Sequence, residues 1–200
     1  MVGREAVGVG GGGRRGRFSP LAVLLGIGLA AAAAVPGGTR IRAADPDPVA
    51  VRLVDVAGLE AEIARHRGKV VVVDGWSTSC PPCVKEFPNL VALQTRHGER
   101  IACISISLDY EGIDAPEDVL PPVEKFLAKV GAGSIVNLLC TEEADAAYKK
   151  LDLVSVPAVW VYGPDGALVR RFDEDDATKR LERPFHYGDV GAEVERLLAR

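Results

Sequence analysis

The sequence predicts an α/β domain in which a central mixed sheet is flanked by helices and carries a terminal antiparallel hairpin. Segments with the pattern of strands alternate along the chain with segments that have the pattern of helices, which is typical of an open α/β sheet. Residues 69–74 hold four consecutive valines, the pattern of a central strand that is buried on both faces. Residues 163–166, Gly-Pro-Asp-Gly, form a tight turn between two β-rich segments, so these segments should pair as the hairpin.

The first half of the domain alternates in this way. Residues 49–54 are expected to form a strand, and Leu59 and Ile63 mark a short amphipathic helix that ends at a glycine. After the valine-rich strand, residues 86–97 have the pattern of a helix with one apolar face, and residues 101–108 that of a second buried strand.

The second half is richer in loops. Residues 109–122 contain three prolines and should form a loop. The elements expected after it are a helix at 123–130, a strand at 135–139, a helix at 142–151, a strand at 154–162 interrupted by Pro157, a strand at 167–172 and a helix at 190–199. Residues 173–187 are charged and irregular, and no element is predicted for them.

The N-terminal residues 1–44 have the composition of an export signal. Arg14 and Arg15 precede an apolar run and then small residues that end near Ala44, where we expect cleavage. The alternative is an uncleaved membrane anchor, because residues 18–39 carry no charge and are long enough to span a bilayer. Both alternatives place the domain outside the cytoplasm, either free in the periplasm or anchored facing it.

The remaining chain divides into a linker and one domain. Residues 45–48, Asp-Pro-Asp-Pro, should be a linker, because alternating prolines enter neither a helix interior nor a central strand. The domain is therefore expected to span residues 49–200. We expect it to be a monomer.

Composition argues against several classes of function. The net charge of −4 and the low aromatic content of 6% give no basic or stacking surface for nucleic acid. Four cysteines are too few for a small disulfide-stapled scaffold. No second cysteine pair or closely spaced histidine pair is present, so we expect no metal site.

The most informative motif is Cys80-Pro81-Pro82-Cys83, which follows the valine-rich strand at the expected start of a helix. Disulfide exchange needs one thiolate that attacks and a second thiol close enough to release the mixed disulfide. A cysteine at a helix N-terminus meets unpaired N–H groups and the positive end of the helix dipole, which favour the thiolate. We therefore expect Cys80 to be the nucleophile and Cys83 the resolving thiol of a redox-active disulfide. A purely structural disulfide is the alternative.

Together with this pair, Trp76, the sequence Glu86-Phe87-Pro88 and the late Val156-Pro157 resemble the thioredoxin superfamily. More narrowly, they are similar to the TlpA/ResA-like extracytoplasmic thiol–disulfide oxidoreductases. The resemblance covers about residues 49–172 and implies a thioredoxin-like fold with the family's insertion at 109–139. It implies no cofactor, and as partners it implies disulfide-containing exported proteins and an upstream thiol reductase. Cytochrome c maturation is a frequent role among such relatives.

The resemblance also implies roles for single residues. Pro157 should follow a cis bond and face the cysteines; the alternative is an ordinary proline in an edge strand. Trp76, Val156 and Pro157 would contact the substrate. Asp74 matches a buried aspartate that relays a proton to or from the resolving cysteine, the alternative being a strand-end carboxylate in solvent. Glu86 matches an acidic residue beside the active site, the alternative being an exposed helix glutamate.

Two residues depart from the family pattern. Ser79 stands where an aromatic residue is usual, which should open the surface beside Cys80. Gly75 stands where phenylalanine is usual, which should leave space under the active site. The other two cysteines, Cys103 and Cys140, are expected to be buried and inert, although Cys140 could also pair with another thiol.

The sequence thus predicts a thiol–disulfide oxidoreductase of the reductase type. A thiol peroxidase and a non-catalytic module that binds partners are the two alternatives, and the direction of electron flow is not determined by the sequence.

Overall fold

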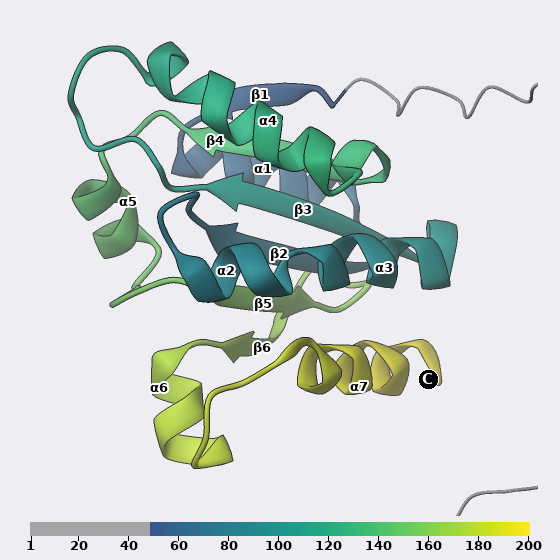
Figure 1. The fold of residues 1–200 in the computed structure, drawn as a ribbon. Helices are drawn as coiled ribbons and strands as arrows, with labels where there is room; N and C mark the ends of the chain where they lie inside the picture. The colour runs from purple at the N-terminus through teal and green to yellow at the C-terminus, as the bar shows by residue number, and fades with distance from the viewer. Residues whose placement is uncertain (1–48) are drawn as a thin grey trace, which may run out of the picture. The chain divides into compact units, whose positions relative to one another are not determined.

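The computed structural model describes residues 49–200, which form one six-stranded sheet with helices on both faces (Figure 1). The predicted export signal or anchor at 1–44 and the predicted linker at 45–48 lie outside the described residues. The strands are β1 (Val51–Val54), β2 (Val70–Trp76), β3 (Ile101–Ser107), β4 (Val136–Cys140), β5 (Ala158–Tyr162) and β6 (Leu168–Phe172). The helices are α1 (Val56–Arg65), α2 (Pro81–Glu86), α3 (Pro88–His97), α4 (Leu120–Lys129), α5 (Ala144–Lys150), α6 (Glu174–Asp176) and α7 (Tyr187–Leu198).

The sheet is mixed, as predicted. Its strand order is β1-β4-β3-β2-β5-β6, and the first four of these strands run parallel to one another. β5 is antiparallel to both β2 and β6, so the predicted hairpin forms one edge of the sheet. The valine-rich strand β2 is buried along its whole length between β3 and β5.

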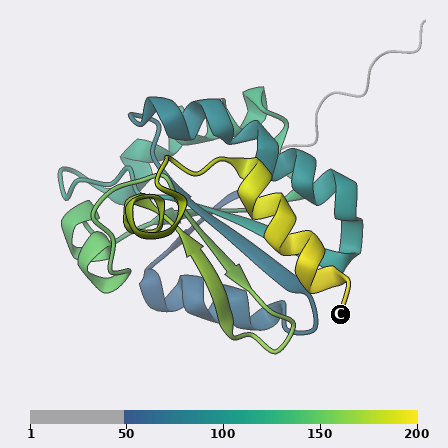
Figure 2. The same cartoon turned by 90° about the horizontal axis from the view of Figure 1, so that it is seen from below.

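Helices cover the two faces of the sheet unequally. Side chains of α2, α3, α4 and α7 pack with Val70 and Val72 on one face, whereas α1 and α5 pack with Val71 and Val73 on the other. Figure 2 shows α1 on one side of the sheet and α3 and α7 on the opposite side. Because side chains alternate along a strand, Asp74 points to the face that carries α2 and α7. This alternation decides which groups can meet at the carboxyl end of β2.

The helix after β2 begins at Pro81, so Cys80 stands at a helix start as the cysteine motif predicts, although the apolar-face pattern marked the helix only from residue 86. Proline is well tolerated in the first turn, where an N–H group has no intrahelical partner. The helix is then divided into α2 and α3 at Phe87. Pro88 has no N–H to donate to the preceding turn, so the helix is interrupted there.

The charged segment for which no element was predicted is ordered into short helices. Asp173 is the N-cap residue of α6, and its side chain accepts a hydrogen bond from the Asp176 N–H at 2.9 Å. A π-helical turn, Ala177–Leu181, continues α6. α7 begins at Tyr187, three residues before the predicted start at residue 190. Within residues 49–200, no helix is both long enough and apolar enough to span a membrane.

Candidate active site

The cysteine pair lies where β2 passes into α2. Cys80 is the N-cap residue of α2, and a disulfide joins it to Cys83 across a Cα–Cα distance of 5.3 Å. Cys80 is half-buried, whereas only 3% of Cys83 is exposed. The first cysteine is thus the one that another protein can reach.

The start of α2 offers Cys80 a single backbone donor. The Cys83 N–H donates to Cys80 Sγ at 3.3 Å. The N–H groups of the second and third helical residues normally bond to an N-cap side chain, but Pro82 occupies the second position and has none. A Cys80 thiolate would therefore be stabilised by the helix dipole and by this one hydrogen bond.

The loop before Cys80 is held by Asp109, which follows β3. The Asp109 carboxylate accepts hydrogen bonds from Ser77 Oγ at 2.8 Å, Thr78 N at 2.9 Å, Thr78 Oγ1 at 2.6 Å and Ser107 Oγ at 2.6 Å. Sequence reasoning missed Asp109. The sequence did offer a signal for Asp109. The loop Ser77-Thr78-Ser79 follows β2 and Asp109 follows β3, and the carboxyl ends of adjacent parallel strands lie side by side.

Replacing Asp109 with asparagine should lower the free energy of unfolding by about 2 kcal/mol, because an amide offers one acceptor oxygen where the carboxylate uses two. Urea unfolding of the oxidised protein measures this loss. Asp145→Asn is the matched control, since Asp145 is exposed and such surface changes usually stay within about 0.5 kcal/mol. Equal stability of the two variants would show that Asp109 does not hold the loop.

The segment before β5 faces the cysteine pair. The Val156–Pro157 peptide bond is cis, which is the geometry that the resemblance implies. The Val156 carbonyl oxygen lies 3.6 Å from Cys80 Sγ. The strand predicted from residue 154 starts only at Ala158, and among the described residues no backbone hydrogen bond involves Val156.

Asp74 is buried beneath the pair, with 3% of its surface exposed. The Tyr187 hydroxyl donates a hydrogen bond to Asp74 Oδ2, while Oδ1 has no partner within residues 49–200. Burial raises the pKa of Asp74 to about 7, and the hydrogen bond from Tyr187 acts in the opposite direction. The alternative of a strand-end carboxylate in solvent is therefore wrong.

A cavity of about 360 Å³ adjoins this carboxyl group. Four of the residues singled out in the sequence line it together, namely Asp74, Cys83, Glu86 and Pro157. Glu86 is half-buried there and accepts a hydrogen bond from Asn89 Nδ2 at 3.0 Å. The remaining lining comes largely from residues 173–187, for which the sequence predicted no element, and includes Tyr187.

Cys80 borders a different hollow, of about 610 Å³, on the other side of the pair. Ser79, Asp109, Tyr148 and Val156 are among its lining residues. Ser79 is exposed, and its hydroxyl lies 2.9 Å from that of Ser77. The nucleophile candidate and the free backbone of Val156 thus open onto one surface.

Two predictions about this region are wrong. Trp76 is fully buried and packs against Phe87, with ring centroids 4.9 Å apart, so it belongs to the core and cannot contact a substrate. Gly75 leaves no space, because a Cβ atom there would lie 3.0 Å from the Trp160 ring. The sequence could not show that Trp160 of the neighbouring strand β5 covers Gly75.

The two other cysteines are free and buried, as expected. Burial raises the pKa of both the Cys103 and the Cys140 thiol, so neither is a ready nucleophile. Within the described part of the chain, His, Cys, Asp and Glu side chains form no group of three that could hold a metal ion.

Solved structures with this fold include the two that follow. A secreted Mycobacterium tuberculosis disulfide oxidoreductase homologous to E. coli DsbE matches with a TM-score of 0.50 and 17% identity, over 67% of this chain and 86% of that one. A protein described as thioredoxin-like superfamily matches with a TM-score of 0.50 and 19% identity, over 69% of this chain and 85% of that one. The domain therefore has the thioredoxin-like fold.

This thioredoxin-like chain also has curated relatives, which are thiol–disulfide oxidoreductases. ResA of Bacillus thuringiensis subsp. konkukian is 22% identical over 131 residues, which are 65% of this chain and 69% of that protein. ResA of Bacillus subtilis is 28% identical over 118 residues, which are 59% of this chain and 60% of that protein. No protein-family model matches the chain. The predicted resemblance to ResA-like oxidoreductases is thus confirmed at distant identity.

Proposed function

We propose that the protein is a thiol–disulfide oxidoreductase that reduces or rearranges disulfides of exported proteins through Cys80 and Cys83. One observation carries the proposal: an accessible cysteine caps a helix, and its buried partner lies one turn further on. This arrangement provides an attacking sulfur and a resolving sulfur within bonding distance. The ResA-type relatives support it.

The proposed reaction has two exchange steps. The Cys80 thiolate attacks one sulfur of the substrate disulfide, and the other substrate sulfur leaves as a thiolate that takes up a proton. Cys83 then loses its proton and attacks Cys80, so the second substrate sulfur leaves. The substrate gains two electrons, the pair becomes the disulfide seen in the structure, and an upstream thiol reductase must restore the dithiol.

Further roles follow from the same geometry. We assign to Asp74 the transfer of the Cys83 proton, since both groups line the same cavity and the pKa of Asp74 is raised to about 7 by burial. Val156, whose carbonyl oxygen lies beside Cys80, would pair with the extended backbone of the substrate next to Pro157. Glu86 would add negative charge at the mouth of the cavity.

The place of action is proposed to be outside the cytoplasm. The N-terminal pattern of residues 1–44 supports export, and one structural neighbour is a secreted protein. In this arrangement residues 45–48 would link the signal or anchor to the domain at 49–200.

The Cys83→Ala variant should accumulate mixed disulfides with periplasmic proteins, because no thiol remains to release them from Cys80. Non-reducing gels followed by mass spectrometry detect these adducts, and reduction of insulin by the unmodified protein measures the reaction itself. Cys103→Ala is the control, since Cys103 lies in the core and should trap nothing. Absence of both adducts and insulin reduction would favour the non-catalytic binding module.

The thiol peroxidase alternative has less support. That chemistry uses a threonine hydroxyl near the attacking sulfur, but the Thr78 hydroxyl donates to Asp109 at 2.6 Å. Consumption of hydrogen peroxide by the Cys83→Ser variant would revive this alternative.

A further inference from the structure

We propose that Tyr187 is a positioning residue for the resolving step, because its hydroxyl holds one oxygen of Asp74 and leaves the other free beside the cavity that Cys83 lines. The inference deepens the proposed function and rests on it for the role of Cys83. No sequence motif marks Tyr187, which lies at the end of residues 173–187, for which no element was predicted.

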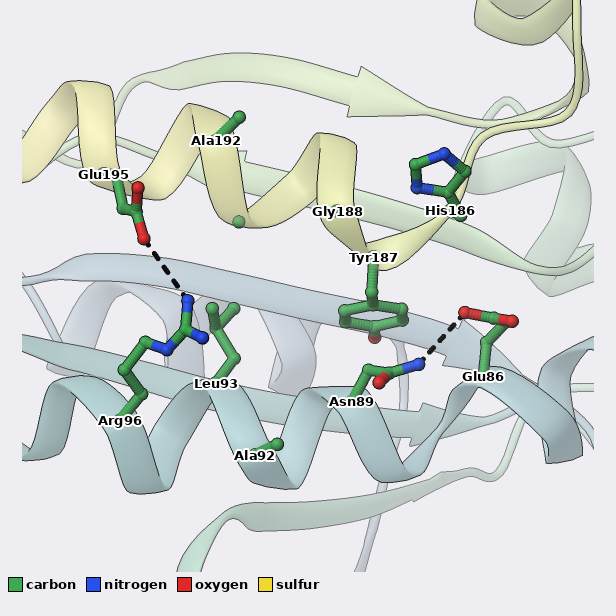
Figure 3. A pocket seen from close by; sticks show the side chains of 11 residues that line it. Glu86, Asn89, Ala92, Leu93, Arg96, His186, Tyr187, Gly188, Ala192 and Glu195 are labelled. Atoms are coloured by element: carbon green, nitrogen blue, oxygen red, sulfur yellow. Dashed lines mark hydrogen bonds and ion pairs between the residues drawn. The ribbon is translucent and has the colours of Figure 1, made fainter.

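The contact joins distant parts of the fold. Tyr187 is the first residue of α7 and is buried, and it meets Asp74 in the central strand β2, 113 positions earlier. Figure 3 shows the Tyr187 side chain reaching from the first turn of α7 into the space between α7 and α3. Because Tyr187 Oη donates to Oδ2, only Oδ1 of Asp74 remains without a partner among the described residues.

Hydrogen bonds fix the start of α7 and therefore the position of Tyr187, its first residue. The Asp189 carboxylate accepts a hydrogen bond from the His186 N–H at 3.1 Å, which caps the helix. The same carboxylate binds both terminal nitrogens of Arg183, at 2.9 and 2.7 Å. Along the helix, Arg96 of α3 pairs with Glu195 of α7 at 3.3 Å (Figure 3).

Among the described residues, no positively charged side chain lies beside Asp74 in the cavity. The cavity is lined by the acidic side chains of Glu86, Asp173 and Glu174, and no lysine, arginine or histidine lines it. From β3, Cys103 faces Asp74 as a buried neutral thiol, and from α2 Cys83 faces the cavity. Within residues 49–200, the Tyr187 hydroxyl is therefore the one group that stabilises the Asp74 anion, which burial otherwise disfavours.

The proposed proton transfer uses the cavity that Cys83 and Asp74 both line. Cys83–SH gives its proton to Oδ1 of the Asp74 carboxylate, and the Cys83 thiolate attacks Cys80 Sγ. The bond between Cys80 and the substrate sulfur breaks, and the substrate thiolate takes up a proton from Asp74 or from water. Without the hydrogen bond from Tyr187, Asp74 would be protonated over more of the neutral pH range and could not accept that proton.

The test compares Tyr187→Phe with Tyr162→Phe, since Tyr162 lies at the far end of β5 and its hydroxyl makes no hydrogen bond in the described structure. Carboxyl ¹³C NMR of the oxidised proteins follows the titration of Asp74 without relying on activity. Tyr187→Phe should move its midpoint upward by about one pH unit, because a hydrogen bond to a charged group is lost. The acidic limb of the pH profile for insulin reduction should move by the same amount, and Tyr162→Phe should change neither.

An unchanged Asp74 midpoint in Tyr187→Phe would overturn the inference, whereas lack of insulin reduction by the unmodified protein would instead overturn the proposed function. If Tyr187→Phe does not fold, the unmodified protein still provides a test. The ¹³Cζ resonance of Tyr187 should then shift with the same midpoint as the Asp74 carboxyl group, and a resonance that stays constant through that titration would refute the contact.

Discussion

In the reduced protein, iodoacetamide near neutral pH should modify Cys80 at least about tenfold faster than an unperturbed cysteine, while the other three thiols stay largely unmodified. Cys80 is accessible, and the dipole of α2 and the Cys83 N–H both favour its thiolate. At pH 7 only a few per cent of a free cysteine is ionised, so stabilising the Cys80 thiolate can raise the reactive fraction about tenfold. Peptide mapping by mass spectrometry over time measures each rate separately.

A denatured control and one variant sharpen this experiment. Urea should expose Cys103 and Cys140, each 1% exposed in the fold, and make all thiols react at similar rates. Pro82→Ala adds a backbone N–H at the second helical position and should extend fast labelling of Cys80 to lower pH, because a second donor reaches the sulfur. Labelling of Cys83 before Cys80 would reverse the proposed order of the two sulfurs.

The fold was largely predictable because it follows from local patterns. The buried valine run of β2, the turn at 163–166 and the alternation of strands and helices each reflect a periodicity that the backbone imposes. Errors fell at proline-containing boundaries. Pro88 divides the predicted helix into α2 and α3, and β5 begins only at Ala158, after Pro157.

The site was less predictable, because its partners come from distant parts of the chain. Motif reasoning placed Cys80, Cys83, Asp74 and Pro157 in one region, since three of them flank the end of β2. Tyr187 carried no such signal: it follows an irregular charged segment, and only the packing of α7 on the sheet brings it to Asp74.

Trp76 shows the opposite error, because a motif residue was given a role in binding. It follows Asp74 by two positions in β2, so strand alternation points both side chains to the same face, under α2. The Trp76 ring fills the core against Phe87 and Phe126, with centroids 4.9 and 4.8 Å away. The Trp76 ring does not titrate, whereas the carboxyl group of Asp74 makes burial at the same face sensitive to pH.

That sensitivity gives a large expected effect on stability. When the pH is raised from about 4 to 7, the free energy of unfolding of the oxidised protein should fall by about 4 kcal/mol relative to that of the Asp74→Asn variant. The folded-state pKa of Asp74 is raised from 3.8 to about 7, so in this window the native state holds a proton that the unfolded chain has released. This contribution to stability is complete below about pH 4 and is lost as the pH rises through 7.

Asparagine at position 74 is the matched variant, because its amide oxygen can still accept the hydrogen bond from Tyr187 but does not titrate. Urea unfolding of both proteins at several pH values gives the difference. Surface carboxylates with lowered pKa, such as Asp189 beside Arg183, change the stability of both proteins equally, so their contribution cancels in the difference. Parallel stability curves would mean that Asp74 is ionised in the fold at low pH, and such a carboxylate could not exchange a proton with Cys83 near neutral pH.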